Sequence, residues 1–142
     1  MSSSYIPAAL RRRLLLESDR RCAYCRSSEI FMGAPLEVEH IIPRALKGKT
    51  TYNNLCLACH RCNEYKSDRI AAIDPLTKET IALFNPRLQH WREHFMWSRD
   101  GIEIIGITPC GRATVEALRL NNENVVTARY IWAKVGFHPP ID

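Results

Sequence analysis

The stretch LEVEHIIPRALKGKTTYNNLCLACHRCNEYKSD, residues 36–68, decides the fold. Its opening, LEVEHII, has the β-branched content of a short strand, and the polar, glycine-containing PRALKGKTTYNN is typical of a turn-rich loop. LCLA (55–58) predicts a second strand, and RCNEYKSDRIAAI (61–73) predicts a helix. The order strand, loop, strand, helix indicates a small α+β core.

Two C-x-x-C pairs surround this core, one upstream at 22–25 and one inside the stretch at 59–62. This spacing lets two thiolates on one turn reach a single Zn²⁺ at about 2.3 Å. In a reducing compartment such pairs indicate a metal site rather than disulfides. Cys56 is equally spaced from Cys59, so a pair of these two stays open as an alternative. The expected ligands of a closed structural zinc site are Cys22, Cys25, Cys59 and Cys62.

Outside this core, the sequence predicts a basic N-terminal helix and a C-terminal extension. Pro7 followed by AALRRRLLLES favours a helix to about Ser18. Downstream, ETIALF (79–84) predicts a strand, and Asn85-Pro86 predicts the start of a helix with an apolar stripe of Leu88, Trp91 and Phe95. HFMW and IEIIGI predict a hairpin. Helices are expected after Thr108-Pro109 and after Asn122, the first with a solvated face of Arg112, Glu116, Arg119 and Glu123, the second with Val126, Tyr130 and Ala133 aligned.

The chain of 142 residues is the size of one domain, and we expect three regions within it: 1–21, 22–70 and 71–142, the last packed on the core. The formal net charge is +5, and residues 1–26 carry six arginines against two acidic residues. This basic bias is compatible with a polyanionic partner. No apolar run approaches the ~18 residues of a membrane span, and the first residues are not expected to act as a secretory signal. A cytoplasmic protein without a membrane partner is expected.

The residues between the cysteine pairs resemble the HNH endonuclease family, in its variant with two zinc-binding cysteine pairs around a ββα-metal fold, similar to phage junction-resolvase-type nucleases. The resemblance is carried by CAYC (22–25), VEHIIPR (38–44) and NLCLACHRCNEYK (54–66), with LFNPR further on. It implies a metal-dependent endonuclease that hydrolyses phosphodiester bonds. One alternative function is that of a noncatalytic zinc-ribbon module that binds nucleic acid. Another is that of a structural or protein-interaction domain.

The resemblance also implies a role for individual residues. His40 corresponds to the general base, since a neutral imidazole suits proton abstraction near neutral pH. Glu39 and Asn63 correspond to the ligands of a Mg²⁺ or Mn²⁺ ion, which takes oxygen ligands, with Glu37 as an alternative carboxylate. Asn54 corresponds to the asparagine that ties down the long loop. His60, inside the second cysteine pair, is expected near the site or in solvent, with a contact to phosphate left open. His90, His94 and His138 are expected to pack or to lie at the surface.

Arg44 and Lys66 are the residues expected to contact the nucleic-acid backbone, through salt-sensitive and sequence-independent interactions. The expected partner is duplex or branched DNA, with RNA left open. A monomer would nick one strand, whereas double-strand cleavage would need a homodimer or sequential events.

Overall fold

The computed structural model describes residues 5–141, so residues 1–4 and Asp142 of the predicted end regions lie outside the described residues. The chain forms two compact units. The first consists of the chain up to Ile70 together with Asn85–Leu88, and the second of Ala71–Phe84 together with the chain from Gln89 onward. The three-region division predicted from the sequence stays a prediction. Over residues 5–141, no helix combines the length and the apolar character that crossing a membrane requires.

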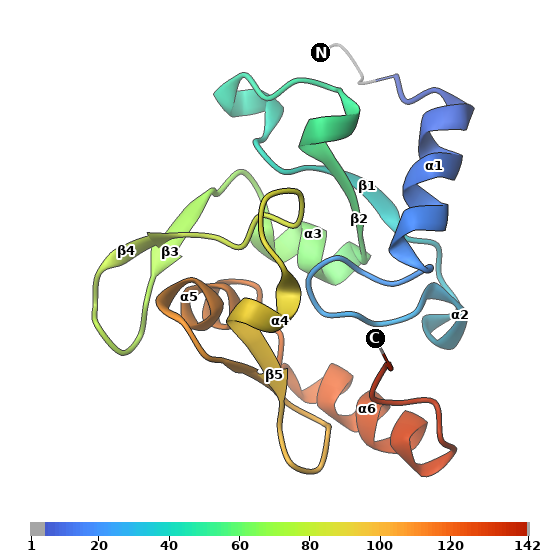
Figure 1. Cartoon of the computed structure of the whole chain (residues 1–142), viewed down its shortest axis with the longest axis vertical. Helices are drawn as coiled ribbons and strands as arrows, with labels where there is room; N and C mark the ends of the chain where they lie inside the picture. The colour runs from blue at the N-terminus through green and yellow to red at the C-terminus, as the bar shows by residue number, and fades with distance from the viewer. Residues whose placement is uncertain (1–4, 142) are drawn as a thin grey trace. The chain divides into compact units, whose positions relative to one another are not determined.

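The first unit contains a two-stranded antiparallel sheet followed directly by a helix (Figure 1). Strand β1 (Glu37–His40) pairs with β2 (Leu55–Ala58), with Glu37 opposite Ala58 and His40 opposite Leu55. The remaining elements are α1 (Ala8–Ser18), α2 (Glu29–Met32), α3 (His60–Lys66) and two 3₁₀ turns, Arg44–Leu46 and Tyr52–Asn54. The predicted α+β class and the strand, loop, strand, helix order are confirmed.

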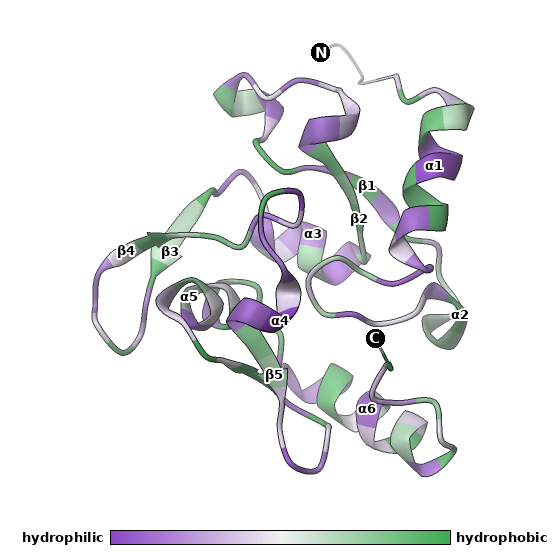
Figure 2. Cartoon of the chain, in the orientation of Figure 1, coloured by the Kyte–Doolittle hydropathy of each residue, from purple (hydrophilic) through white to green (hydrophobic). Residues whose placement is uncertain are grey.

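Strand β2 lies at the centre of this unit. All four of its residues are buried, and Figure 2 shows its apolar character against the alternating polar and apolar turns of α1. Helix α1 packs against β2, and the buried residue of this helix is Leu14, which is 2% exposed. Arg11 on the same helix donates a hydrogen bond of 2.9 Å to the carbonyl of Leu36, just before β1. The predicted N-terminal helix is therefore part of the core that supports both strands.

Arg87 joins the first unit from a distant part of the sequence. Its Nε donates to the carbonyl oxygen of Leu55 over 2.9 Å, and its guanidinium lies 4.1 Å from the centre of the Tyr52 ring. The guanidinium of Arg13 lies 3.6 Å from the same ring, and the Tyr52 hydroxyl donates to Glu17. The LFNPR motif thus contributes an arginine that holds α1, the long loop and β2 together.

The predicted helix over 61–73 is wrong beyond Lys66. Helix α3 ends there, and β3 (Ala71–Ile73) pairs instead with β4 (Thr80–Ala82) in the second unit. The turn between these strands is organised by Asp74, whose carboxylate accepts hydrogen bonds from the backbone N–H of Leu76 and the hydroxyl of Thr77. Such Asx turns compete with helix formation. The residues before Asp74 therefore form a strand and not the end of the predicted helix.

The second unit contains β3 and β4, helix α4 (Trp91–His94), the hairpin of β5 (Phe95–Trp97) and β6 (Ile104–Gly106), α5 (Pro109–Ala117) and α6 (Glu123–Lys134). The hairpin and the two last helices agree with the prediction. The predicted helix from Asn85 is wrong, because Asn85 organises a turn by accepting from the N–H of Arg87 and Leu88, and Leu88 is 82% exposed. Trp91 and Phe95 do pack in the core, as expected.

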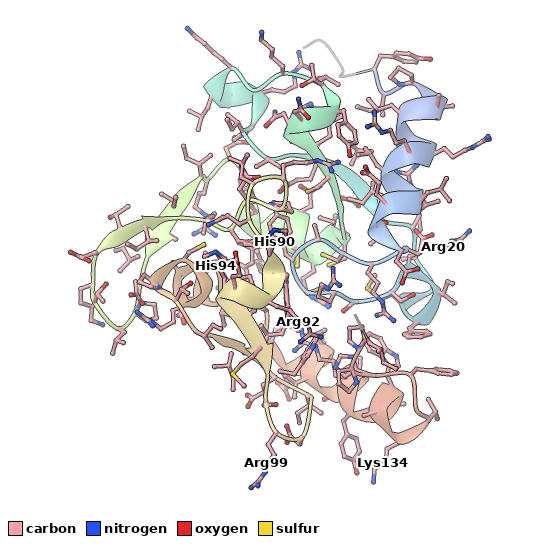
Figure 3. All side chains as sticks on the ribbon, viewed as in Figure 1. Arg20, His90, Arg92, His94, Arg99 and Lys134 are labelled. Carbon is pink, nitrogen blue, oxygen red and sulfur yellow. The ribbon has the colours of Figure 1, made fainter. Side chains whose placement is uncertain are left out.

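Two predicted helix faces differ from those observed. Arg112 is not part of a salt-bridged solvated row, because its Nε and Nη2 donate to both oxygens of Asp74 over 3.0 and 2.9 Å. On α6 the buried residues are Val125 and Arg129, whereas Tyr130 is 52% exposed. Arg129 is buried because it donates to the carbonyls of Ile102 and Leu120. Figure 3 shows Arg99, in the β5–β6 loop, and Lys134, at the end of α6, pointing outward.

The ion pair between the buried Asp74 and the partly exposed Arg112 makes the stability of the second unit pH-dependent. The hydrogen bonds from Arg112 hold the pKa of Asp74 well below its usual range. A depressed pKa in the folded state stabilises the fold above the unfolded pKa of about 3.9, and this contribution is lost as the pH falls further. Asp74→Asn should therefore lower the free energy of unfolding at neutral pH, and its difference from the wild type should shrink below about pH 4.

Urea denaturation followed by tryptophan fluorescence measures this effect, because Trp91, Trp97 and Trp132 all lie in the second unit. Glu116→Gln is the control, since it removes an exposed carboxylate from α5 of the same unit. A constant difference between Asp74→Asn and the wild type from pH 7 to pH 3 would contradict the ion-pair explanation.

Candidate nuclease site and metal-binding cluster

Four buried cysteines form a cluster that could hold a metal ion. The Sγ atoms of Cys22, Cys25, Cys59 and Cys62 all lie within 4.8 Å of one another. Cys25 and Cys59 are 3.7 Å apart, close to the edge of about 3.8 Å that follows for a tetrahedron of sulfurs each 2.3 Å from zinc. Cys56, the alternative left open by the spacing, lies outside the cluster. The residues predicted to form the closed site are therefore the ones that the fold brings together.

The cluster also determines where helix α3 begins. Cys59 is the residue before the first turn of α3, and its sulfur accepts a hydrogen bond of 3.4 Å from the N–H of Cys62. All four cysteines are buried, and burying several thiolates together requires a cation. A metal ion here would fix the first turn of α3, and with it Asn63, the residue that follows the last cysteine.

Asn63 is held by a carboxylate on the neighbouring strand. Its Nδ2 donates to Glu37 Oε1 over 2.9 Å, which leaves the amide oxygen as its acceptor end. The imidazole of His60 lies on the other side of Glu37, with Nδ1 2.9 Å from Oε2. The hydrogen bond from Asn63 is the main reason that the pKa of Glu37 is lowered. His60, expected near the site, therefore contacts the carboxylate that orients Asn63.

Glu39 points into the protein interior. It is 4% exposed, and both of its oxygens accept from the Tyr24 hydroxyl, at 3.0 and 2.9 Å. Lys66 Nζ lies 3.3 Å from Oε1, and the Cys56 thiol donates to Oε2 over 3.5 Å. Burial raises the pKa of Glu39, and the nearby Lys66 charge acts against this rise. Glu39 thus belongs to a buried network that joins β1, β2, α3 and the first cysteine turn.

His40 is the last residue of β1, and its side chain interacts with the long loop. Its Nε2 lies 2.8 Å from Oγ1 of Thr50. Partial burial lowers its pKa, and the positive charges of Arg44 and Lys66 lower it further. The imidazole is therefore neutral over a wider pH range than an exposed histidine. Such an imidazole can accept a proton at neutral pH.

Asn54 fastens the long loop to the end of β1. Its amide makes a two-way pair with Ile42, accepting from the N–H over 2.8 Å and donating to the carbonyl over 2.9 Å. The same Nδ2 donates to the carbonyl of Lys49 over 2.9 Å. Gly48 lies so close that an added Cβ would be 1.6 Å from the Ile42 carbonyl oxygen. This close approach explains a glycine here. These contacts agree with the loop-fastening role implied for Asn54, which stays a prediction.

His40, Glu39 and Asn63 line one pocket. The pocket is partly open, has a volume of about 270 Å³ and is also lined by Arg44 and Asp68. On a regular strand the side chains of Glu39 and His40 point to opposite faces, and β1 ends at His40, where the chain leaves the sheet. The three residues predicted to carry the chemistry therefore share a cavity, although the Glu39 carboxylate is directed toward Tyr24 and Lys66.

The two residues expected to contact DNA differ in position. Arg44 lies at the pocket and close enough to His40 to affect its pKa. Lys66 is 1% exposed, and its Nζ donates to the carbonyl of Ile41 over 2.9 Å. The structure contradicts a backbone contact for Lys66, because a phosphate cannot reach an ammonium group that is buried and already bonded. Lys66 instead supports the end of β1 and the Glu39 carboxylate.

Tyr24, Thr50 and Arg87 contact the site or its core but are missing from the sequence prediction. Tyr24 lies between Cys22 and Cys25, where a variable position in C-x-x-C gives no signal of its own. Thr50 lies in a polar loop, and only the three-dimensional path of that loop brings it to His40. The LFNPR motif drew attention to the region of Arg87 but not to a contact with β2.

Comparison with known proteins supports the family. A family model described as HNH endonuclease matches residues 22–69. The CRISPR-associated endonuclease Cas9 of Corynebacterium diphtheriae is 46% identical over 54 residues, which are 37% of this chain and 5% of that protein. The chain thus covers only a small part of this relative's length. No solved structure matches. The predicted resemblance is confirmed for this segment, and the β1–β2–α3 arrangement with its cysteine cluster fits a ββα-metal fold.

Loss of one cluster sulfur should remove the bound metal and open the core. Cys59→Ser should reduce the metal content of the purified protein to near zero, because three thiolates hold a metal much less tightly than four. A structural metal site supplies on the order of 10 kcal/mol of folding free energy, so amide hydrogen exchange in residues 22–68 should become fast. Elemental analysis and exchange mass spectrometry measure both effects.

Cys56→Ala, which leaves the cluster intact, should retain one metal per chain. A wild-type protein that carries no metal would contradict the assignment.

Proposed function

We propose that this chain, whose residues 22–69 belong to the HNH endonuclease family, hydrolyses phosphodiester bonds in DNA with the aid of a divalent metal ion. The observation that carries the proposal is the pocket shared by His40, Glu39 and Asn63 within the matched segment. The name of the Corynebacterium relative, an endonuclease, supports the same reaction class. A noncatalytic zinc ribbon would not need a neutral histidine in a pocket with oxygen donors.

In the proposed reaction His40 is the general base. It takes a proton from a water molecule, and the resulting hydroxide attacks the phosphorus. The neutral state of His40 is favoured by its partial burial and by the charges of Arg44 and Lys66. General-base catalysis of this kind contributes about 10²- to 10⁴-fold to the rate.

Glu39 and Asn63 are the proposed ligands of a Mg²⁺ or Mn²⁺ ion. A carboxylate and an amide oxygen are donors that suit such an ion, and they leave positions for the water ligands that hard cations keep. Both oxygens of Glu39 accept from Tyr24, and Oε1 lies 3.3 Å from Lys66 Nζ, so ligation requires one of these contacts to give way to the cation. When bound, the ion supplies charge neutralisation of the phosphate and stabilisation of the departing 3′ oxygen. Asn63 suits the role because its Nδ2 is occupied by Glu37, which leaves its oxygen for the cation.

Glu37 is the rival carboxylate. It touches Asn63 directly, whereas Glu39 shares its oxygens with Tyr24 and with Lys66. We assign ligation to Glu39, which lines the pocket with His40, and assign to Glu37 the orientation of Asn63.

The four-cysteine cluster is proposed to hold a structural zinc ion. Four thiolates leave no open coordination position, so this ion would support the fold and take no part in hydrolysis. Thiolate ligands persist in a reducing compartment such as the cytoplasm, which is the proposed location. The proposed partner is duplex or branched DNA, contacted by Arg44, and the working form is a monomer or homodimer.

A plasmid-nicking assay tests the proposal. The protein should convert supercoiled DNA to the open circle with Mg²⁺ or Mn²⁺ and not with a chelator. His40→Ala should lower the rate at least about 100-fold, because the base is lost. His90→Ala, which changes an exposed histidine of the second unit, is the control and should cut at the wild-type rate. Retardation of DNA by the wild type without any cleavage would instead support the noncatalytic zinc ribbon.

The carboxylate assignment has its own test. Glu39→Gln should raise the Mn²⁺ concentration needed for half-maximal cleavage at least about tenfold, since a neutral amide binds a hard cation more weakly than a carboxylate does. Glu37→Gln should have a smaller effect, because it retains an oxygen that accepts from Asn63. Thermal unfolding followed by circular dichroism should accompany both variants, since Glu39 is buried beside Lys66. If Glu37→Gln raised the Mn²⁺ concentration for half-maximal cleavage more than Glu39→Gln did, Glu37 would be the ligand.

A further inference from the structure

The hydroxyl of Thr50 is in direct contact with the imidazole of His40. The distance from Nε2 to Oγ1 is 2.8 Å. Among residues 5–141, Nδ1 of His40 has no hydrogen-bonding partner. The two nitrogens of the proposed base thus have different surroundings, one bonded to the loop and one unoccupied.

This difference matters because a neutral imidazole carries a single N–H. If Thr50 accepts from Nε2–H, the lone pair of Nδ1 is left to take a proton. If Thr50 donates to Nε2 instead, the proton lies on Nδ1 and no basic nitrogen remains. The partner of one ring nitrogen therefore decides whether the other can act as a base.

We propose that Thr50 is a positioning residue that holds His40 as the Nε2–H tautomer, so that Nδ1 is the nitrogen that accepts the proton of the attacking water. This inference rests on the proposed nuclease function and deepens it. During the step, the water O–H bond breaks and a new N–H bond forms at Nδ1. The resulting imidazolium keeps its Nε2–H bond to Thr50. The hydroxide oxygen bonds to phosphorus as the bond from phosphorus to the 3′ oxygen breaks, and the 3′ oxygen leaves with the electron pair of that bond.

The fold is built to keep Thr50 in place. Lys49, the residue before it, has its carbonyl bound by Asn54 Nδ2 over 2.9 Å. The same Asn54 amide is paired with Ile42, two residues after His40. Gly48 allows the loop backbone to lie against the Ile42 carbonyl. The loop that carries Thr50 and the strand end that carries His40 are thus fastened to each other by one side chain, which limits how far the Thr50 hydroxyl can move from the ring.

Nitrogen NMR of the wild-type protein tests the tautomer without any substitution. In ¹⁵N-labelled protein, at a pH where His40 is neutral, long-range ¹H–¹⁵N spectra distinguish protonated from bare ring nitrogens. We expect His40 to be predominantly the Nε2–H tautomer. A predominant Nδ1–H tautomer would overturn the proposal. Assignment of the signals uses His40→Ala, whose spectrum should lack them.

Substitution of Thr50 tests the consequence for catalysis. Thr50→Val keeps the shape of the side chain and removes the hydroxyl. It should lower kcat about tenfold to a hundredfold with little change in KM, and the His40 signals should shift toward a mixture of tautomers. Thr50→Ser restores an oxygen and should return kcat to within about threefold of the wild type. Wild-type kcat in Thr50→Val would overturn the proposal.

Thr51→Val is the matched control, because Thr51 is the exposed neighbour and its side chain makes no capping hydrogen bond. It should leave kcat and the His40 spectrum unchanged. The experiments distinguish a failure of the proposed nuclease function from a failure of the proposed role of Thr50. A wild-type protein that does not cut DNA removes the nuclease function, whereas the NMR spectrum still reports whether Thr50 sets the tautomer. An active enzyme with the wrong tautomer removes only the role of Thr50.

Discussion

The buried cysteine cluster is the constraint on which the rest of the first unit depends. It brings residues 22–25 and 59–62 to one point, although more than thirty residues separate them. Because Cys59 begins α3 and Cys62 completes its first turn, the direction of the helix follows from the cluster. Helix geometry then places Asn63 and Lys66, three residues apart, on one side of α3, where they meet Glu37 and Glu39 of β1.

The pair of Lys66 and Glu39 is a costly element for so small a core. Two buried charges lose their hydration, and a close partner with further hydrogen bonds is needed to offset that loss. The structure supplies them: Tyr24 donates to Glu39, and the carbonyl of Ile41 accepts from Lys66. Apolar residues of the same size would pack here without that cost. A charged network of this kind is expected where a core must keep a carboxylate next to a functional pocket.

The sequence predicts the parts of this fold that depend on local pattern. LCLA predicts a strand at the residues observed, and the Thr108-Pro109 cap predicts α5. The two C-x-x-C pairs supply the ligands of the cluster, although the spacing alone left Cys56 open as an alternative. The prediction fails where a side chain overrides periodicity. Asp74 turns a helical apolar run into a hairpin, and Asn85 turns a predicted helix start into a tight turn.

The same distinction between local sequence pattern and tertiary contact applies to the candidate site. His40 and Asn63 are recognisable from their neighbours in the sequence, and the fold places them in one pocket. The partners that orient them are not recognisable, because each comes from another segment: Thr50 from the loop for His40, and Tyr24 from the cysteine turn for Glu39. The position of Lys66 illustrates the same limit. From the sequence, a lysine at the end of a helix is expected to be exposed to solvent. Lys66 is buried because α3 packs against β1.

Glu39 and His40 are neighbours on β1 whose side chains point in opposite directions. The proposed metal ligand and the proposed base are therefore held in place by different parts of the fold. Glu39 points inward and is held by Tyr24 and α3, so the ligand side depends on the cysteine cluster. His40 is held by Thr50, so the base side depends on the loop that Asn54 fastens. The strand end is the place where both supports meet, since Lys66 and Asn54 both bind the backbone just after His40. Two separately braced elements that converge on one strand end can hold a base and a ligand rigidly, without requiring the strand itself to be long.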